Sequence, residues 1–245
     1  MNKDLELLYG WNVCNAILQN NNRKVEKIFL LEEKAKEYLK LINSNLHPKI
    51  ERLNSKQMFI KTGEQHKHQG VAVLASKYKS SGEIANILQN TQEKQTALIL
   101  DGVQDPHNLG NIIRTAFCLG VNEIVITQHD SCDINNTVAR SSAGYLDYVN
   151  VYKVGNLSQT IEKLKKNNFW VIGFDSNVTD KDQTFQSTMH KYEKVALIFG
   201  SEGFGMKDLT KKNCDLLVKI PINEKADSLN VCTAVTIALY ERGGG

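Results

Sequence analysis

The chain has 245 residues, and its hydrophobic and charged fractions of 41% and 23% are those of a globular protein with one or two domains. It contains no run of about 18 apolar residues that could span a membrane, and its first residues, MNKDLELLYG, lack an apolar stretch of signal-peptide length. The net charge of +3 divides unevenly, since residues 1–90 carry +5 and the remainder −2, which suits either a basic part that meets a polyanion or an ordinary solvated surface.

The first part of the chain mixes helical and strand-like patterns. Its apolar spacing and β-rich runs predict a helix over WNVCNAILQN, a strand over KIFLL, a helix over EEKAKEYLKLI and a buried strand over GVAVLA. The polar stretch that follows contains one short helical piece and resembles a connection between domains. We therefore expect a first domain over residues 1–76, a linker over 77–94 and a second domain over 95–245.

The second part alternates apolar strands with amphipathic helices. Strands are predicted at TALILDGV, EIVIT, FWVIGF, VALIFG and LLVKIPI, and helices at LGNIIRTAFCLG and LSQTIEKLKKN. This alternation predicts an α/β fold with a mostly parallel sheet covered on both faces.

Three loops that follow predicted strands carry more polar and glycine residues than packing requires, at the strand ends where open α/β sheets bind ligands. In the first, Pro106 precedes Asn108, which is placed to cap the following helix. Arg114 shares the polar face of that helix with Asn111 and Cys118, where it meets either a substrate or solvent.

The other two loops are rich in glycine and in polar side chains. In FGSEGFGM, glycines surround Ser201 and Glu202, but their order does not match the dinucleotide fingerprint. IPINEKADSLNV leads into a helix predicted to begin near Ser228, a candidate cap, with Leu229 as a plausible core residue.

Other chemistries fit these residues less well. Asp101, Asp105 and His107 lack a familiar metal-ligand spacing, and the HKH run at 66–68 suits a polar surface, so no metal site is expected. Ser201 does not lie in a nucleophile elbow. The five cysteines are odd in number and widely spaced, which argues against disulfides and zinc, favours a reducing compartment such as the cytoplasm, and leaves no matched base beside Cys118 or Cys232.

Taken in order, DGVQDPHNLGNIIRTAFCLG, LIFGSEGFGM and IPINEKADSLNVCTAVTIALYE resemble the three motifs of the SpoU (TrmH) family of RNA ribose 2′-O-methyltransferases, in the SPOUT superfamily. NTVARSSAGYLDYVNV resembles the segment between the first two motifs, and YGWNVCNAIL with HQGVAVL resembles the substrate-binding domain of the 23S rRNA guanosine-2′-O-methyltransferase subgroup. The resemblance covers nearly the whole chain.

The resemblance implies S-adenosylmethionine as methyl donor and an RNA ribose 2′-hydroxyl as acceptor, most closely a guanosine in the P loop of 23S-type rRNA, free or in a pre-ribosomal particle. It also implies a catalytic α/β domain with a deep trefoil knot, a small ribosomal-protein-like α/β domain that binds RNA, and a homodimer. Neither a membrane nor DNA is expected as a partner.

Residue roles follow from the motif positions. The resemblance implies catalytic roles for Asn108, Arg114, Glu202, Ser228 and Asn230, and places Gly200, Ile220 and Leu229 where relatives hold the adenosine of the cofactor through backbone groups. We expect Arg114 to stabilise charge on the 2′-oxygen and hold the adjacent phosphate, since a guanidinium group does not readily give up a proton and so is a poor base. We expect Glu202 to orient Arg114 or its neighbours.

The chain departs from the family pattern in the third motif. Ile222 replaces a common methionine, Glu224 a common glycine and Cys232 a common serine, which puts the rim of the cofactor loop in doubt. A tRNA ribose methyltransferase and a non-enzymatic RNA-binding or ribosome-assembly protein stay open as alternatives.

Overall fold

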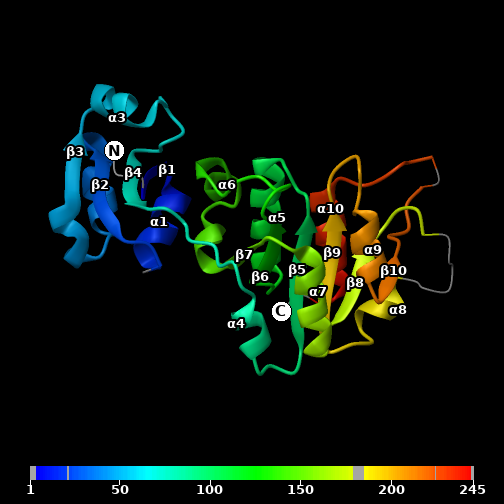
Figure 1. The fold of residues 1–245 in the computed structure, drawn as a ribbon. Helices are drawn as coiled ribbons and strands as arrows, with labels where there is room; N and C mark the ends of the chain where they lie inside the picture. Colours follow the sequence, from blue (N-terminus) through cyan, green and yellow to red (C-terminus); the bar gives the residue numbers. More distant parts are fainter. Residues whose placement is uncertain (1–3, 21, 179–184, 224, 244–245) are drawn as a thin grey trace. The chain divides into compact units, whose positions relative to one another are not determined.

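The computed structural model describes residues 4–20, 22–178, 185–223 and 225–243, which belong to two compact units (Figure 1). One unit consists of the chain up to Lys79 together with Ile134–Tyr148. The other consists of Ser80–Asp133 and the chain from Val149 onward. No helix in the described ranges is both long and apolar enough to cross a bilayer.

The first unit has a four-stranded sheet in the order β1-β4-β2-β3, in which only the β2/β3 pair is parallel. Its elements are β1 (Leu5–Tyr9), α1 (Trp11–Gln19), β2 (Val25–Leu31), α2 (Ala35–Leu39), β3 (Ile50–Leu53), α3 (Ser55–Thr62) and β4 (Val71–Ser76). The predicted strands and the first predicted helix are present, whereas β1, β3 and α3 were not predicted. The second predicted helix is shorter than expected, because a 3₁₀ turn occupies its first residues, Glu32–Lys34.

The segment Ile134–Tyr148, which we call the arm, lies between two strands of the second unit in sequence but packs in the first unit. It contains α6 (Asn136–Ser141) and a 3₁₀ turn (Tyr145–Tyr148). Arg23 donates from Nε to Asp147 Oδ1 at 2.5 Å, and both side chains are almost fully buried. Arg140 donates to the Tyr9 hydroxyl at 2.8 Å and lies over its ring. The first unit is therefore built from two separate pieces of chain.

The second unit has a six-stranded sheet in the order β10-β8-β9-β5-β6-β7, in which every pair is parallel. The strands are β5 (Gln95–Asp101), β6 (Glu123–Thr127), β7 (Asn150–Val154), β8 (Trp170–Phe174), β9 (Lys194–Gly200) and β10 (Leu216–Val218). The helices are α4 (Ala85–Gln89), α5 (Pro106–Cys118), α7 (Leu157–Lys166), α8 (Phe185–Met189), α9 (Asp208–Asn213) and α10 (Val231–Glu241). The predicted parallel α/β sheet is confirmed.

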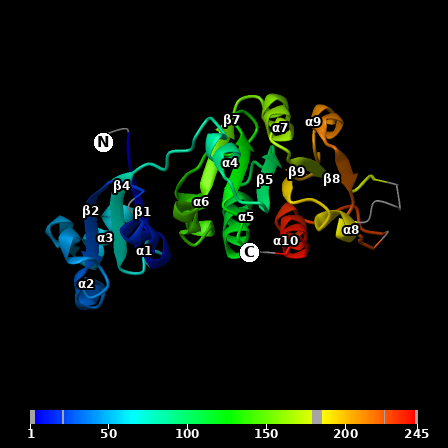
Figure 2. The ribbon, with the colours of Figure 1, turned by 90° about the horizontal axis from the view of Figure 1, so that it is seen from below.

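Helices cover both faces of this sheet, as the apolar strands require. Figure 2 shows α4, α7 and α9 on one face and α5 and α10 on the other. Successive side chains of a strand alternate between the two faces, so Ala97 and Ile99 join the core beneath α4 and α7. On the opposite face α5 packs beside α10. The carboxyl ends of the strands, where the three polar loops begin, meet at one edge.

The two helices that follow the polar loops begin at residues other than those predicted. Asp105, rather than Asn108, is the N-cap of α5, and its carboxylate accepts a hydrogen bond from His107 N at 3.0 Å. Pro106 occupies the first helical position, where its missing N–H costs nothing. The N-cap of α10 is Asn230 rather than Ser228, and it accepts from Cys232 N at 2.9 Å. Asn108 therefore lies inside the first turn, and its side chain is not used as a cap.

Candidate functional site

Three polar side chains from the three loops meet at the carboxyl edge of the parallel sheet. Glu202 Oε1 accepts hydrogen bonds from Asn108 Nδ2 at 2.8 Å and from Asn230 Nδ2 at 2.6 Å. Asn108 comes from the first turn of α5, Glu202 from the turn after β9 and Asn230 from the cap of α10. Asn108 lies 94 positions from Glu202 in the chain and Asn230 lies 28 positions from it, yet both bind the same oxygen atom. We call these three residues the Asn–Glu–Asn cluster.

The thiol of Cys232 fixes the orientation of Asn108 within this cluster. Cys232 Sγ lies 3.3 Å from Asn108 Oδ1 and 3.4 Å from Asn108 O, within donating distance of both. Burial raises the pKa of Cys232 to about 11, and the nearby carboxylates of Glu202 and Asp105 act in the same direction. The thiol is therefore protonated at neutral pH and serves as a hydrogen-bond donor, not as a nucleophile.

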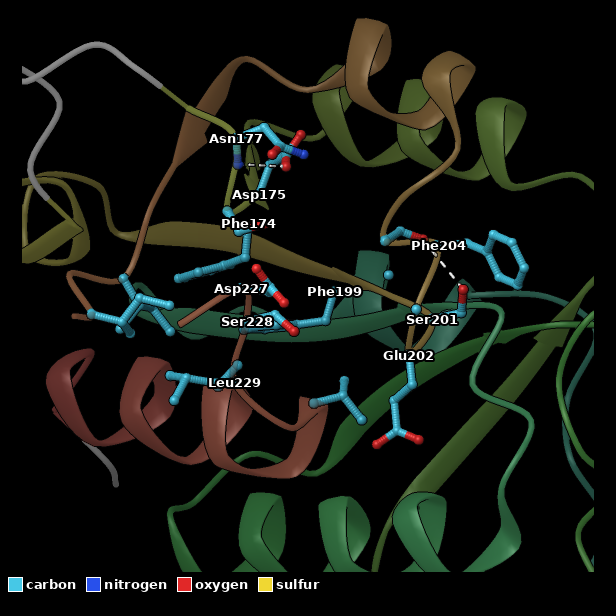
Figure 3. Close-up of a pocket in the computed structure, with 18 of the residues that line it drawn as sticks. Phe174, Asp175, Asn177, Phe199, Ser201, Glu202, Phe204, Asp227, Ser228 and Leu229 are labelled. Atoms are coloured by element: carbon cyan, nitrogen blue, oxygen red, sulfur yellow. Dashed lines mark hydrogen bonds between the residues drawn. The ribbon is translucent and has the colours of Figure 1, made fainter. Parts of the chain in front are cut away.

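A pocket of about 410 Å³ opens beside the cluster, over the ends of β8, β9 and β10 (Figure 3). Its apolar walls include Phe174 and Phe199, whose rings stack with centroids 4.3 Å apart, together with Ile220 and Leu229. Its polar lining includes the carboxyl groups of Asp175, Asp227 and Glu202 and the side chain of Ser228. Flat apolar walls with several carboxylates suit a ligand that has an aromatic ring and cationic groups.

Gly200 occupies a position in the pocket wall where no side chain fits. A Cβ atom added there would lie 2.0 Å from the carbonyl carbon of Gly205 and 2.1 Å from Met206 N. The loop after β9 turns back so closely that Gly205 and Ser201 exchange backbone hydrogen bonds at 3.0 and 3.1 Å. The glycine therefore allows the loop to return, and it leaves backbone groups exposed to the pocket.

The remaining predicted site residues lie in or near this pocket. Gly200, Ile220, Ser228 and Leu229 line it together with Glu202. Leu229 is half-buried, so its prediction as a core residue was wrong; it is a pocket wall. Glu224 lies outside the described residues, whereas the second departing residue, Ile222, lines the pocket.

Arg114 lies on the exposed face of α5, as its spacing predicted. It follows Asn108 by six residues, about 9 Å along the helix axis at 1.5 Å per residue. Within the described ranges, it has no hydrogen bond or ion pair, either with Glu202 or with another residue. The carboxylate of Glu202 orients the two asparagines instead.

One loop of the pocket was not anticipated from the sequence. The turn after β8 contributes Asp175, which forms an ion pair with Lys211 at 2.7 Å and accepts from Asn177 N at 3.0 Å. Burial alone raises the pKa of Asp175, but the hydrogen bonds from Lys211 and Asn177 outweigh it and hold that pKa below its usual value. The polar run DSN directly after the strand FWVIGF was the available signal, because it stands at the same sheet edge as the other loops.

The residues considered for a metal site have structural partners. Asp101 is 2% exposed and accepts from Thr210 Oγ1 at 2.7 Å and from Lys207 N at 3.2 Å, so it ties the end of β5 to the start of α9. Asp105 caps α5. Among the described residues, no group of three or more His, Cys, Asp or Glu side chains has the arrangement of a metal site.

Comparison with protein families matches both parts of the chain. Residues 95–240 match the SpoU rRNA Methylase family, and residues 7–81 match the RNA 2′-O ribose methyltransferase substrate-binding family. A TrmH-family tRNA/rRNA methyltransferase of Staphylococcus aureus is 40% identical over 177 residues, which cover 71% of this chain and 69% of the relative.

Two solved structures share the fold over 98% of the chain. The SpoU methyltransferase AviRb from Streptomyces viridochromogenes, in complex with the cofactor AdoMet, has a TM-score of 0.78 at 18% identity over 89% of its length. An AdoMet-bound rRNA methyltransferase from Sinorhizobium meliloti has a TM-score of 0.77 at 21% identity over 87% of its length. At these identities the two structures establish the similarity of the fold.

Proposed function

The chain belongs to the SpoU rRNA methylase family, and we propose that it methylates a ribose 2′-hydroxyl in 23S-type rRNA. As a member of this family it is an RNA methyltransferase that uses S-adenosylmethionine. The observation that supports the proposal most strongly is the Asn–Glu–Asn cluster, because it joins the three family motifs at one edge of the pocket.

The pocket suits S-adenosylmethionine on chemical grounds. The apolar side chains of Phe174, Ile220 and Leu229 can contact the adenine ring, and backbone groups near Gly200 can meet its polar edge. Asp227 offers negative charge to the cationic amino-acid portion, whereas the charge of Asp175 is already paired with that of Lys211, which also lines the pocket. When bound, this cofactor supplies an activated methyl group on a sulfonium ion.

The protein's own residues then position the acceptor and manage its charge. Glu202 holds the amides of Asn108 and Asn230 in a fixed geometry next to the pocket. Arg114, which is exposed and free of partners in the described ranges, would hold an RNA phosphate with its planar fork and stabilise negative charge on the 2′-oxygen. An arginine is too weak an acid to act as the base, so the proton passes to water or phosphate.

The proposed target is a guanosine in the P loop of 23S-type rRNA, free or in an assembling particle. The substrate-binding family match and the basic charge of residues 1–90 support an RNA-binding first domain. A tRNA target is the second candidate, because the Staphylococcus aureus relative carries a name that covers both RNA classes.

The remaining features implied by the family resemblance belong to the same proposal. They are the domain limits 1–76, 77–94 and 95–245, a deep trefoil knot in the second domain, a homodimer, and a cytoplasmic location. The arm is an exception to these domain limits. It lies within residues 95–240, which match the methylase family, but it packs in the first unit.

Calorimetry with S-adenosylmethionine, followed by methyl transfer to purified rRNA, tests the proposal. We expect one binding event per chain and transfer of label to ribose. Absence of binding with and without RNA would favour a non-enzymatic RNA-binding protein. Binding followed by transfer to tRNA alone would reassign the substrate.

A further inference from the structure

Phe204 is the most exposed large apolar side chain among the described residues that Figure 3 draws at the pocket. It is 93% exposed and stands in the turn after β9, two residues beyond Glu202. Figure 3 shows the phenyl ring and the Glu202 carboxylate leaving the same turn in different directions. An exposed aromatic ring beside a nucleic-acid-binding site is available to stack on an unpaired base.

The backbone of the turn is closed on both sides of Phe204 by hydrogen bonds. Ser201 N donates to Gly205 O at 3.1 Å and Gly205 N donates to Ser201 O at 3.0 Å, which closes a narrow hairpin around the phenylalanine. Gly203 and Gly205 have φ angles of +86° and +68°, which side-chain-bearing residues rarely adopt. The backbone that fixes Glu202 in the Asn–Glu–Asn cluster therefore also fixes where Phe204 projects.

A second, smaller hollow lies against this ring. It has a volume of about 220 Å³, roughly half that of the cofactor pocket, and Gln104, Asp130 and Lys207 contribute polar groups to its lining. Lys207 and Asp130 form an ion pair across it. A flat apolar face next to an amide, a carboxylate and an ammonium group matches a nucleobase, which has a π-face and hydrogen-bonding edges.

We propose that Phe204 is a positioning residue that stacks on a nucleobase of the bound RNA at or beside the target nucleotide. The inference rests on the proposed function, which brings an RNA ribose to the neighbouring pocket. Every base has a π-face, so stacking on Phe204 does not depend on the RNA sequence. The ring therefore sets the position of the strand, and the polar groups of the smaller hollow contact the edge of the stacked base.

Substitutions at position 204 with separate readouts test this role. Phe204→Ala is expected to raise KM for RNA about 10-fold while kcat and the Kd for S-adenosylmethionine stay within about 3-fold, since loss of one base stack corresponds to roughly a tenfold change in affinity. Phe204→Trp should restore KM, whereas Phe204→Leu should not, because leucine is apolar but has no ring. Leu209→Ala removes another exposed apolar side chain, 62% exposed on α9, and should leave KM unchanged.

A direct signal complements the kinetics. In Phe204→Trp, RNA is expected to quench indole fluorescence beyond the change seen in the parent protein, which contains Trp11 and Trp170. Equal rescue by leucine and tryptophan, an unchanged KM in the alanine variant, or a loss confined to cofactor affinity would each overturn the stacking role. Failure of the proposed function would look different, because the parent protein itself would then transfer no methyl group to RNA.

Discussion

Arg114 is the one charged side chain among the predicted catalytic residues that has no partner within the described ranges, and it is exposed on α5. If it grips a phosphate with two parallel hydrogen bonds, a lysine at this position keeps the charge but loses the fork. We expect Arg114→Lys to lower kcat/KM for RNA at least about 10-fold without changing cofactor affinity. Lys163→Arg, the reverse exchange at an exposed basic residue of α7, is the control. Steady-state kinetics would contradict the fork if Arg114→Lys turned over like the parent.

Glu202 uses one oxygen for both asparagines, which gives the cluster a specific test. The side-chain carbonyl of a glutamine can accept both hydrogen bonds, whereas alanine accepts neither. We expect Glu202→Ala to reduce kcat about 100-fold and Glu202→Gln to stay within about 10-fold of the parent. Single-turnover methyl transfer measures both. A glutamine variant as inactive as the alanine variant would show that the carboxylate itself takes part in proton transfer.

Cys232 provides a test that depends on pH. Because its pKa is raised to about 11, the thiolate is scarce at pH 8, and alkylation should accelerate as the pH rises toward 11. Exposed Cys118 is the internal reference and should react first. Peptide mass spectrometry after timed iodoacetamide treatment follows both sites. Preferential labelling of Cys232 near pH 7 would contradict its role as a protonated donor to Asn108.

The sequence predicted which residues belong to the site but not how they are used. Asn108 and Ser228 are residue types that commonly cap helices, yet the N-caps of α5 and α10 are Asp105 and Asn230. The choice depends on a local competition, since Pro106 at the first helical position moves the cap one residue upstream of it. Asn108 is thereby free to donate to Glu202, a contact between distant residues that no local pattern contains.

The arm shows how an element can leave the unit to which its sequence neighbours belong. Arg23 holds Asp147 and Glu6 in a buried ion-pair network, with distances of 2.5 and 2.6 Å. Asn22 and Asn20 also donate to the Asp147 carbonyl. Removing Arg23 would leave a buried carboxylate without its counter-charge, so the arm depends on this contact.

This contact can be tested by a pair of substitutions. We expect Arg23→Met to destabilise the protein by about 3–5 kcal/mol, while Lys27→Met, which removes an exposed pair with Glu51, costs at most about 1 kcal/mol. Denaturant unfolding gives both values. Equal effects of the two variants would mean that the arm is not held by the buried pair.

At the level of elements, periodicity located the central strands of both sheets, but it missed the edge strands β1, β3 and β7. The long apolar runs of β5 and β9 were predicted because parallel central strands are hydrophobic on both faces. Strands β1 and β3 are short and lie at the two edges of their sheet, where the pattern is weak. The arm could not be assigned to the first unit, because its contacts with Arg23 and Tyr9 join residues 124 and 131 positions apart, which no local pattern contains.

For the whole molecule, the parallel sheet followed from the alternation of strands and helices, whereas the enzyme class followed from resemblance of the three motifs. Residues of the three motifs meet at one edge of one pocket, which explains in physical terms why the motifs occur together. The arm also complicates a deletion of the first domain. Removing residues 1–76 would expose Asp147 and its neighbours to solvent and would remove Arg23, the partner of Asp147. Point substitutions are therefore the better way to separate RNA binding from methyl transfer.

Mapping of ribose methylation in rRNA, with and without the active protein, tests the central claim most directly. In a strain that lacks this chain, 23S-type rRNA should lose one 2′-O-methyl group at a P-loop guanosine. The purified protein with S-adenosylmethionine should restore it, and the Glu202→Ala variant should not. An unchanged rRNA methylation pattern in that strain, together with no transfer in vitro, would contradict the account.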